Sequence, residues 1–217
     1  MNQLIFKFPF KTNYFEEDFY VSENNFEAYK LIENWPKWPS KLINIFGPSG
    51  CGKTHLANVL NNKINSFFIK AAELNDNIFS VVKVKECLII DEYNNNVEEK
   101  LLYSVINQSH LSNQYIIINT LKPIQSYEVS LNDLSSRFSS FVNISIDLPT
   151  DELIKVIISK NFSDKQVKIE NKLLEYIVKN IDRSYEAIFD LIDKLDHFSL
   201  SAGRSININL IKKALNK

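Results

Sequence analysis

Gly47-Pro48-Ser49-Gly50-Cys51-Gly52-Lys53-Thr54 is the stretch of sequence that decides the fold. It fits the pattern GxxxxGK[ST] and lies between an apolar run and a segment of helical period, which is the context that the pattern requires. Backbone N–H groups at glycine turns and at a helix N-terminus can surround phosphate oxygens. Lys53 would reach the β- and γ-phosphates and the Thr54 hydroxyl would ligate Mg²⁺, so the segment predicts a nucleotide site.

Two other interpretations of this segment are weaker. A chance glycine-rich turn would not need the flanking strand and helix, and a nucleophilic Ser49 in G-x-S-x-G would need glycine where Cys51 stands. We count His55, which follows Thr54, with the nucleotide contacts. The imidazoles of His55, His110 and His197 lack metal-ligand spacing, so we expect them to be structural and predict no zinc site.

Short apolar runs alternate with longer segments of helical period through the first two thirds of the chain. This alternation is typical of a parallel sheet covered by helices. We therefore predict an α/β fold in which a five-stranded parallel sheet is sandwiched by helices. The expected strands are Leu42–Phe46, Phe67–Lys70, Cys87–Asp91, Tyr115–Asn119 and Val142–Ile146, and the clearest crossover helices are Thr54–Ile64 and Glu98–Gln108.

The strand pattern ends at Leu148-Pro149-Thr150-Asp151, where proline stops the preceding element and Thr150 or Asp151 can cap a helix. The remaining residues predict a small all-helical domain that we expect to act as a lid. Its expected helices are Glu152–Ser159, Asn171–Asn180, Tyr185–Leu200 and Asn209–Asn216. The predicted domains are residues 1–14 as an N-terminal arm, 15–147 as the nucleotide-binding domain and 148–217 as the lid.

Polar side chains follow the third and fourth predicted strands. Asp91 is placed to hold magnesium through water, and Glu92 to orient or deprotonate a water aimed at the γ-phosphate. Asn119 could contact the γ-phosphate or the attacking water, or it could cap the loop that leads to Pro123. Carboxylates at strand ends are often solvated caps, but the phosphate loop makes the catalytic interpretation of Asp91 and Glu92 the stronger one.

The bulk composition excludes several classes of protein. The net charge of -1 lacks the excess of Lys and Arg that marks a general nucleic-acid binder. Two cysteines do not make a disulfide framework. The start MNQLIFKFPFK does not read as a signal peptide, and the longest apolar runs fall far short of the roughly 20 residues that span a bilayer. We expect a cytoplasmic protein that does not contact the membrane.

The order of phosphate loop, Asp-Glu strand, polar strand end and then Leu134-Ser135-Ser136-Arg137-Phe138 resembles the AAA+ ATPases of the DnaA replication-initiator family. In that family the arginine of this motif acts as a finger on nucleotide bound by a neighbouring subunit. The resemblance implies that role for Arg137, which a guanidinium at a subunit edge could perform. A surface salt bridge is the alternative.

The likeness extends almost end to end to the shorter regulatory inactivators of DnaA, the Hda group. It includes Phe19-Tyr20-Val21-Ser22-Glu23-Asn24-Asn25, Trp35-Pro36-Lys37-Trp38-Pro39 and Ile181-Asp182-Arg183-Ser184. By this resemblance Phe19 and Val21 would contact the adenine. The initiators carry a C-terminal helix-turn-helix domain that has no counterpart here, so we expect no direct sequence-specific DNA binding.

The N-terminal sequence Gln3-Leu4-Ile5-Phe6-Lys7-Phe8 is similar to the peptide by which such inactivators bind the sliding clamp of DNA polymerase III. Leu4, Phe6 and Phe8 would enter an apolar groove while Gln3 makes directional hydrogen bonds. The same alternation is typical of a half-buried edge strand. We favour the clamp-binding interpretation because the peptide stands at the chain terminus with glutamine leading.

Two departures from the initiators bear on catalysis. The lid arginine that touches the nucleotide aligns with Glu186, and Arg183 could replace it because residues three apart share a helix face. The aspartate after the fourth strand aligns with Leu121. We therefore expect firm binding of ADP or ATP with Mg²⁺, and weak intrinsic ATPase activity at most.

The resemblance implies a regulator that docks on DnaA and promotes hydrolysis of DnaA-bound ATP, and it allows a homodimer. The alternatives are a helicase-loader-like AAA+ ATPase and a nucleotide-stabilised clamp adaptor.

Overall fold

The computed structural model describes residues 14–202 and 206–215, and it contains one five-stranded, fully parallel sheet. The spatial order is β2-β3-β4-β1-β5. The strands are β1 Leu42–Phe46, β2 Ser66–Lys70, β3 Cys87–Tyr93, β4 Tyr115–Thr120 and β5 Val142–Ser145. The predicted fold class is confirmed, and each strand lies within two residues of its predicted bounds.

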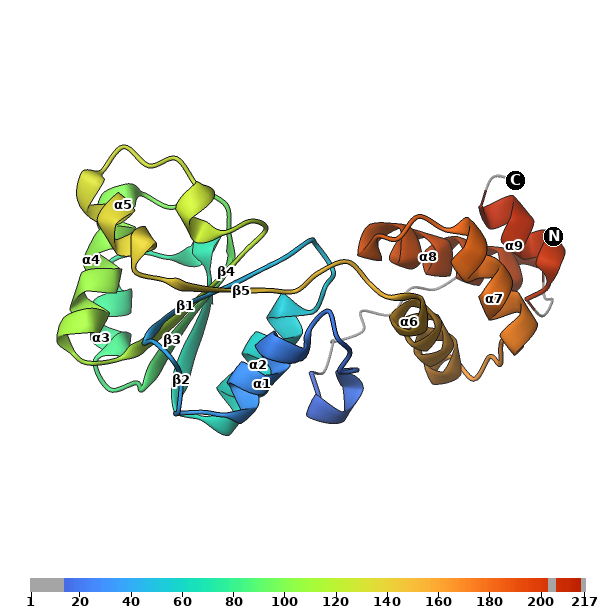
Figure 1. The fold of residues 1–217 in the computed structure, drawn as a ribbon, viewed down its shortest axis with the longest axis horizontal. Helices are drawn as coiled ribbons and strands as arrows, with labels where there is room; N and C mark the ends of the chain where they lie inside the picture. The colour runs from blue at the N-terminus through green and yellow to red at the C-terminus, as the bar shows by residue number, and fades with distance from the viewer. Residues whose placement is uncertain (1–13, 203–205, 216–217) are drawn as a thin grey trace. The chain divides into compact units, whose positions relative to one another are not determined.

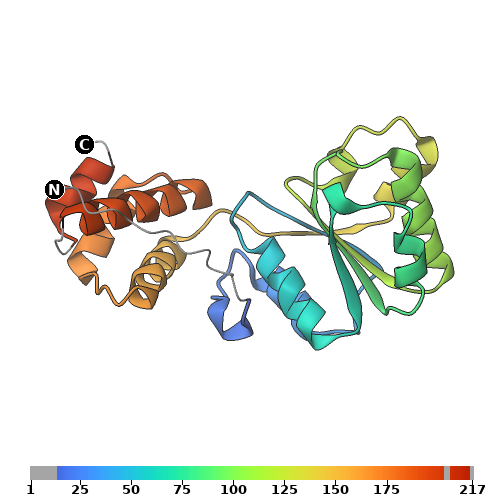
Figure 2. The same ribbon diagram turned by 180° about the vertical axis from the view of Figure 1, so that it is seen from behind.

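Helices cover both faces of this sheet (Figure 1). Helices α1 and α2 lie on one face, and α3, α4 and α5 lie on the other, as the view from behind also shows (Figure 2). Their bounds are α1 Phe26–Glu33, α2 Lys53–Lys63, α3 Ile78–Val82, α4 Glu99–Leu111 and α5 Asn132–Ser139; short 3-10 turns occupy Glu16–Asp18, Ala71–Glu73 and Ile124–Ser126. The apolar periodicity did not predict α3 or α5. Helix α3 has only 5 residues and α5 is mostly polar, so neither shows a clear apolar repeat.

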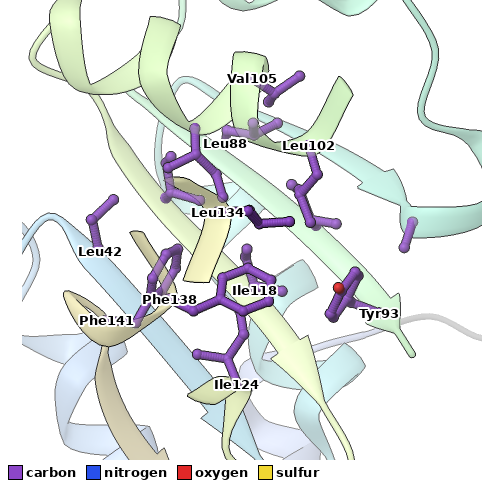
Figure 3. Packing of buried hydrophobic residues seen from close by; sticks show 14 of the residues in the cluster. Leu42, Leu88, Tyr93, Leu102, Val105, Ile118, Ile124, Leu134, Phe138 and Phe141 are labelled. Carbon is purple, nitrogen blue, oxygen red and sulfur yellow. The ribbon is translucent and has the colours of Figure 1, made fainter. Parts of the chain in front are cut away.

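One hydrophobic layer of the sheet unit lies between the sheet and helices α3, α4 and α5. Figure 3 shows Leu88 and Ile118 from the strands meeting Leu102 of α4 and Phe138 of α5. These side chains are buried. Burial of each such side chain contributes about 1.5–3 kcal/mol, so this layer holds α4 and α5 firmly on the sheet.

A second compact unit begins at Leu148 and is helical throughout its described elements. It contains α6 Asp151–Asp164, α7 Asn171–Asn180, α8 Tyr185–Ala202 and α9 Ile208–Ala214. The Thr150 hydroxyl accepts a hydrogen bond from the Leu153 N–H and so caps α6. The prediction ended α6 too early, at Ser159. The helix continues because Phe162 extends the apolar stripe of Ile154 and Ile158 into this unit's own core.

In the part of the chain that the structure describes, none of the helices has both the length and the apolar character needed to cross a bilayer.

Candidate functional site

The topology of the sheet brings three candidate segments to one edge. The phosphate loop follows β1, Asp91 lies near the end of β3, and Asn119 lies near the end of β4. Strand β4 pairs with both β1 and β3, so these three strands are neighbours. Because the strands are parallel, their carboxyl ends meet at one edge, which is where α/β sheets bind ligands.

Two glycines of the phosphate loop are required by close packing. A Cβ on Gly47 would stand 2.3 Å from the Ile146 carbonyl oxygen. Gly52 is the N-cap of α2 with φ 105°, and a Cβ there would stand 2.8 Å from Cε2 of Phe19. Residues other than glycine rarely adopt such a φ. Only glycine fits at these two positions, so the loop can pack its backbone closely against Ile146 and Phe19.

Lys53, the first residue of α2, turns its ammonium toward the loop. Its Nζ donates to the carbonyl oxygens of Gly47 at 2.7 Å and Pro48 at 2.8 Å. The Cys51 thiol lies 3.6 Å from the same nitrogen, and burial raises the pKa of this thiol. Cys51 is therefore a neutral packing residue, while Ser49 at the tip of the loop is exposed. Lys53 can exchange its carbonyl partners for phosphate oxygens.

A chain of hydrogen bonds joins the three segments. The Thr54 hydroxyl donates to Asp91 Oδ2 at 2.7 Å, and Asn119 Nδ2 donates to Asp91 Oδ1 at 2.8 Å. Asp91 is 1% exposed and Asn119 is fully buried. Asn119 Oδ1 makes no hydrogen bond within the described residues, although buried acceptors are nearly always paired. A water or ligand at this edge of the sheet would satisfy it.

The oxygen atoms of Thr54 and Asp91 suit magnesium, which takes few protein oxygens and keeps water and phosphate in its other positions. Among the described residues no three His, Cys, Asp or Glu side chains gather around a metal position. A magnesium ion here would therefore rest on the Thr54 hydroxyl, with Asp91 acting through water. When bound, the ion would shield phosphate charge. Asp91 would orient the Thr54 hydroxyl toward it.

Glu92 lies in a different environment from its neighbour Asp91. Its φ is 59°, in the left-handed region that residues other than glycine rarely adopt. The register between β3 and β4 also shifts between Ile90 and Tyr93. This irregularity turns the Glu92 side chain to solvent, where its carboxylate accepts from Lys70 Nζ at 2.9 and 3.0 Å. Backbone strain of this kind is often retained at functional positions.

The segment around Phe19 lies against the start of α2. The Phe19 ring stacks on Tyr29 with centroids 6.0 Å apart and tilts against His55 at 5.5 Å. The His55 ring nitrogen Nε2 makes a 2.7 Å hydrogen bond with the Phe15 carbonyl. Phe19, Gly52 and His55 thus form one cluster, and Val21 follows it as a half-buried residue.

Two arginines were predicted to act on nucleotide, Arg137 on that of a neighbouring subunit and Arg183 on that of this chain. Arg137 belongs to α5, which lies on the face of the sheet opposite α2 (Figure 1). Its guanidinium Nη2 donates to Asn107 Oδ1 at 2.7 Å. In the helical unit, Arg183 pairs with Asp151 through hydrogen bonds of 3.0 and 3.2 Å. The predicted clamp-binding residues Gln3, Leu4, Phe6 and Phe8 lie outside the described residues.

Sequence reasoning missed Lys70 and Asn107, the partners of Glu92 and Arg137. Lys70 stands 22 positions from its partner and Asn107 stands 30 positions from its own. The parallel pairing of β2 with β3 places Lys70 opposite Asp91. The sequence alone does not give that register, and nothing in it marks Asn107.

Two family models match parts of this chain. The model described as the lid domain of Hda matches residues 151–215, which cover the helical unit. The model described as RNA helicase matches residues 43–122, which include the phosphate loop and Asp91. A match over this part of the chain does not by itself specify a function, because one fold hosts many functions.

Individual proteins give the same picture. The DnaA initiator of Borreliella afzelii is 23% identical over 97% of this chain and 49% of its own length. The chain thus spans about half the length of this curated relative. Domain III of Thermotoga maritima DnaA has the same fold, with a TM-score of 0.78, 20% identity and coverage of 96% of this chain and 98% of that one. AMPPCP-bound DnaA from Aquifex aeolicus matches 84% of this chain and 65% of its own, with a TM-score of 0.67 and 20% identity.

Proposed function

We propose that this chain, a DnaA-like AAA+ protein, is a nucleotide-dependent regulator of replication initiation that promotes hydrolysis of ATP bound to DnaA. The Hda-lid match and the DnaA relatives support a DnaA-related replication regulator. The proposal further specifies which nucleotide the chain binds, which proteins it contacts and that it acts by inactivating DnaA. We expect these partners in the cytoplasm.

The observation that carries the proposal is the position of Arg137. Helix α5 packs on α4, on the face of the sheet away from α2 and its phosphate loop (Figure 1). Arg137 contacts Asn107 there, and its guanidinium has donors to spare, because arginine carries five N–H groups and one is used in this contact. This position supports a role on a nucleotide held by another subunit, where an arginine finger is worth about 10³–10⁵ in rate.

The chain's own nucleotide site supports binding more strongly than turnover. Thr54, Asp91 and Asn119 form a connected set that fits magnesium and a triphosphate or diphosphate. Glu92, the residue that would activate water, is engaged by Lys70. We propose that bound ADP or ATP stabilises the docking-competent form, since a ligand that binds only the folded state stabilises it by mass action.

We also propose that Arg183 contacts this nucleotide. Its present partner, Asp151, forms an exposed ion pair with it, and the two side chains are 64% and 51% exposed. Exposed pairs of this kind are worth only about 0–1 kcal/mol. Arg183 can therefore leave Asp151 for a phosphate at little cost.

Binding of the sliding clamp through Gln3, Leu4, Phe6 and Phe8 is a separate proposal that rests on the sequence resemblance. The double substitution Gln3→Ala and Leu4→Ala should abolish recovery of the chain on immobilised clamp. Unchanged recovery would remove the N-terminal arm from the mechanism without affecting the nucleotide site.

The function is tested by measuring ATP hydrolysis by DnaA with DNA-loaded sliding clamp, with and without this protein. We expect faster hydrolysis, and its loss with Arg137→Ala. Lys100→Ala is the matched control, because it removes an exposed cation from the neighbouring helix α4. If the parent protein has no effect at saturation, the inactivator proposal fails and the helicase-loader or clamp-adaptor alternatives take its place.

A further inference from the structure

A small cavity lies between α3 and α4, away from the nucleotide site. Its walls include the apolar side chains of Ile78, Val82 and Val105 and the polar side chains of Ser109 and Gln114. It gives the centre of a water molecule about 10 Å³ to occupy. Roughly this much space, about 10–15 Å³, is what a single water requires.

Two residues that line this cavity each carry a buried oxygen atom without a hydrogen-bond partner among the described residues. The two atoms are Ser109 Oγ, on a residue that is fully buried, and Gln114 Oε1, on a residue that is 6% exposed. A buried polar oxygen without a partner costs about 1–3 kcal/mol, and native proteins rarely leave one so. Two such oxygens on residues that line one cavity point to a polar binding position.

The surrounding hydrogen bonds keep both residues in place. Gln114 Nε2 donates to the carbonyl oxygens of Val82 at 2.5 Å and Lys85 at 2.6 Å, so the orientation of the amide is determined. The backbone N–H of Gln114 donates to the Ser109 carbonyl at 2.9 Å, which fixes the spacing between the two residues. Gln114 Oε1 therefore cannot leave the cavity wall without breaking contacts to the end of α3.

We propose that this cavity is the binding site of one structural water molecule. The water donates a hydrogen bond to Gln114 Oε1 and exchanges a second one with the Ser109 hydroxyl, which can donate or accept. The ligand is water because the cavity is too small for a larger group. Bound there, it links helix α4 to Gln114, whose amide already holds the end of α3.

Thermal unfolding of Ser109→Ala tests the proposal through the sign of the shift. If the Ser109 hydroxyl were unpaired, its removal would relieve a desolvation cost and leave the melting temperature equal or higher. If it binds the water, its removal should lower the melting temperature by roughly 2–4 °C. Ser112→Ala is the matched control, because Ser112 lines the same cavity but is exposed. It should shift the melting temperature by less than about 1 °C.

A crystal structure of the full chain then gives a direct answer. The expected result is an electron-density peak within hydrogen-bonding distance of both Ser109 Oγ and Gln114 Oε1, and its loss in Ser109→Val, whose methyl groups fill the space. An empty cavity in the parent protein would overturn the proposal. A direct hydrogen bond between Ser109 and Gln114, or a melting temperature that is unchanged or higher in Ser109→Ala, would do the same.

Discussion

Asp91 and Glu92 are adjacent acidic residues on one strand, yet they lie in opposite environments. Asp91 is 1% exposed and joins β3 to α2 and β4 through Thr54 and Asn119. The Glu92 side chain is 57% exposed and pairs with Lys70. The difference shows that the two carboxylates are not a single acidic cap, because one belongs to the interior of the site and the other stands at its rim.

The backbone explains this difference. Successive side chains on a strand alternate between the two sides of the sheet. At Glu92 the left-handed φ of 59° and the shift of register beside it also redirect the chain. Asp91 is therefore fixed by its hydrogen bonds, whereas Glu92 is directed by backbone geometry and by one solvent-exposed ion pair. Substitutions at the two positions should have different consequences.

The largest expected effect comes from Asp91→Asn. Asparagine can keep one hydrogen bond with Thr54 and one with Asn119, so the free energy of unfolding should change little without nucleotide. The substitution removes the negative charge that orients the Thr54 hydroxyl toward magnesium. Changes of this kind to a residue that positions a metal ligand cost about 10- to 100-fold in metal affinity. Titration of a fluorescent nucleotide with and without Mg²⁺ measures this loss.

Glu92→Gln is the matched control, because it makes the same acid-to-amide change one residue later. Its Mg²⁺-dependent affinity should equal that of the parent protein. Equal losses for both variants would mean that the two carboxylates share one role, and the distinction between interior and rim would be wrong.

A smaller effect should follow from changing the backbone preference at position 92. Glu92→Ala and Glu92→Gly both remove the ion pair with Lys70, but only glycine favours the left-handed conformation. Glu92→Gly should therefore be more stable than Glu92→Ala by about 1 kcal/mol. Urea unfolding of the two variants measures the difference. Equal stabilities would show that the backbone at this position is not strained.

Much of this arrangement could be predicted from local sequence. The apolar runs define the sheet because each buried strand needs continuous apolar side chains, and the glycines at 47 and 52 mark a loop whose backbone must stay accessible. Asp91, Asn119 and Thr54 could be assigned to one edge, because parallel strands present their carboxyl ends together. Side chains at the same edge lie close together, so hydrogen bonds among these three residues could be expected.

Contacts between distant segments could not be predicted in the same way. Lys70 meets Glu92, and Asn107 meets Arg137, only because the sheet and the helix packing bring them together. The same reason hides the buried Asn44, whose side chain donates to the Ile118 carbonyl and the Thr120 hydroxyl and accepts from the Ile124 N–H. A polar residue within an apolar run gives no sign of which backbone groups it will satisfy.

The smallest effect concerns Glu16, a half-exposed carboxylate that also pairs with a lysine. Lys63 Nζ lies 2.6 Å from both Glu16 and Glu33, and its hydrogen bond to Glu16 is the main reason why the pKa of Glu16 falls below its ordinary value of 4.5. A lowered folded-state pKa contributes stability that is present above the unfolded-state pKa and is lost as the pH falls through the folded-state value.

The parent protein should therefore exceed Glu16→Gln in stability by a few tenths of a kcal/mol near neutral pH, because exposed pairs are screened by solvent. This difference should shrink as the pH falls below about 4.5. Unfolding curves of both proteins across that range measure it, and a Lys63→Met background should remove it. A difference that grows in acid would mean that the fold stabilises Glu16 in its protonated form. Glu16 would then not be comparable with Glu92, which pairs with Lys70 as a carboxylate.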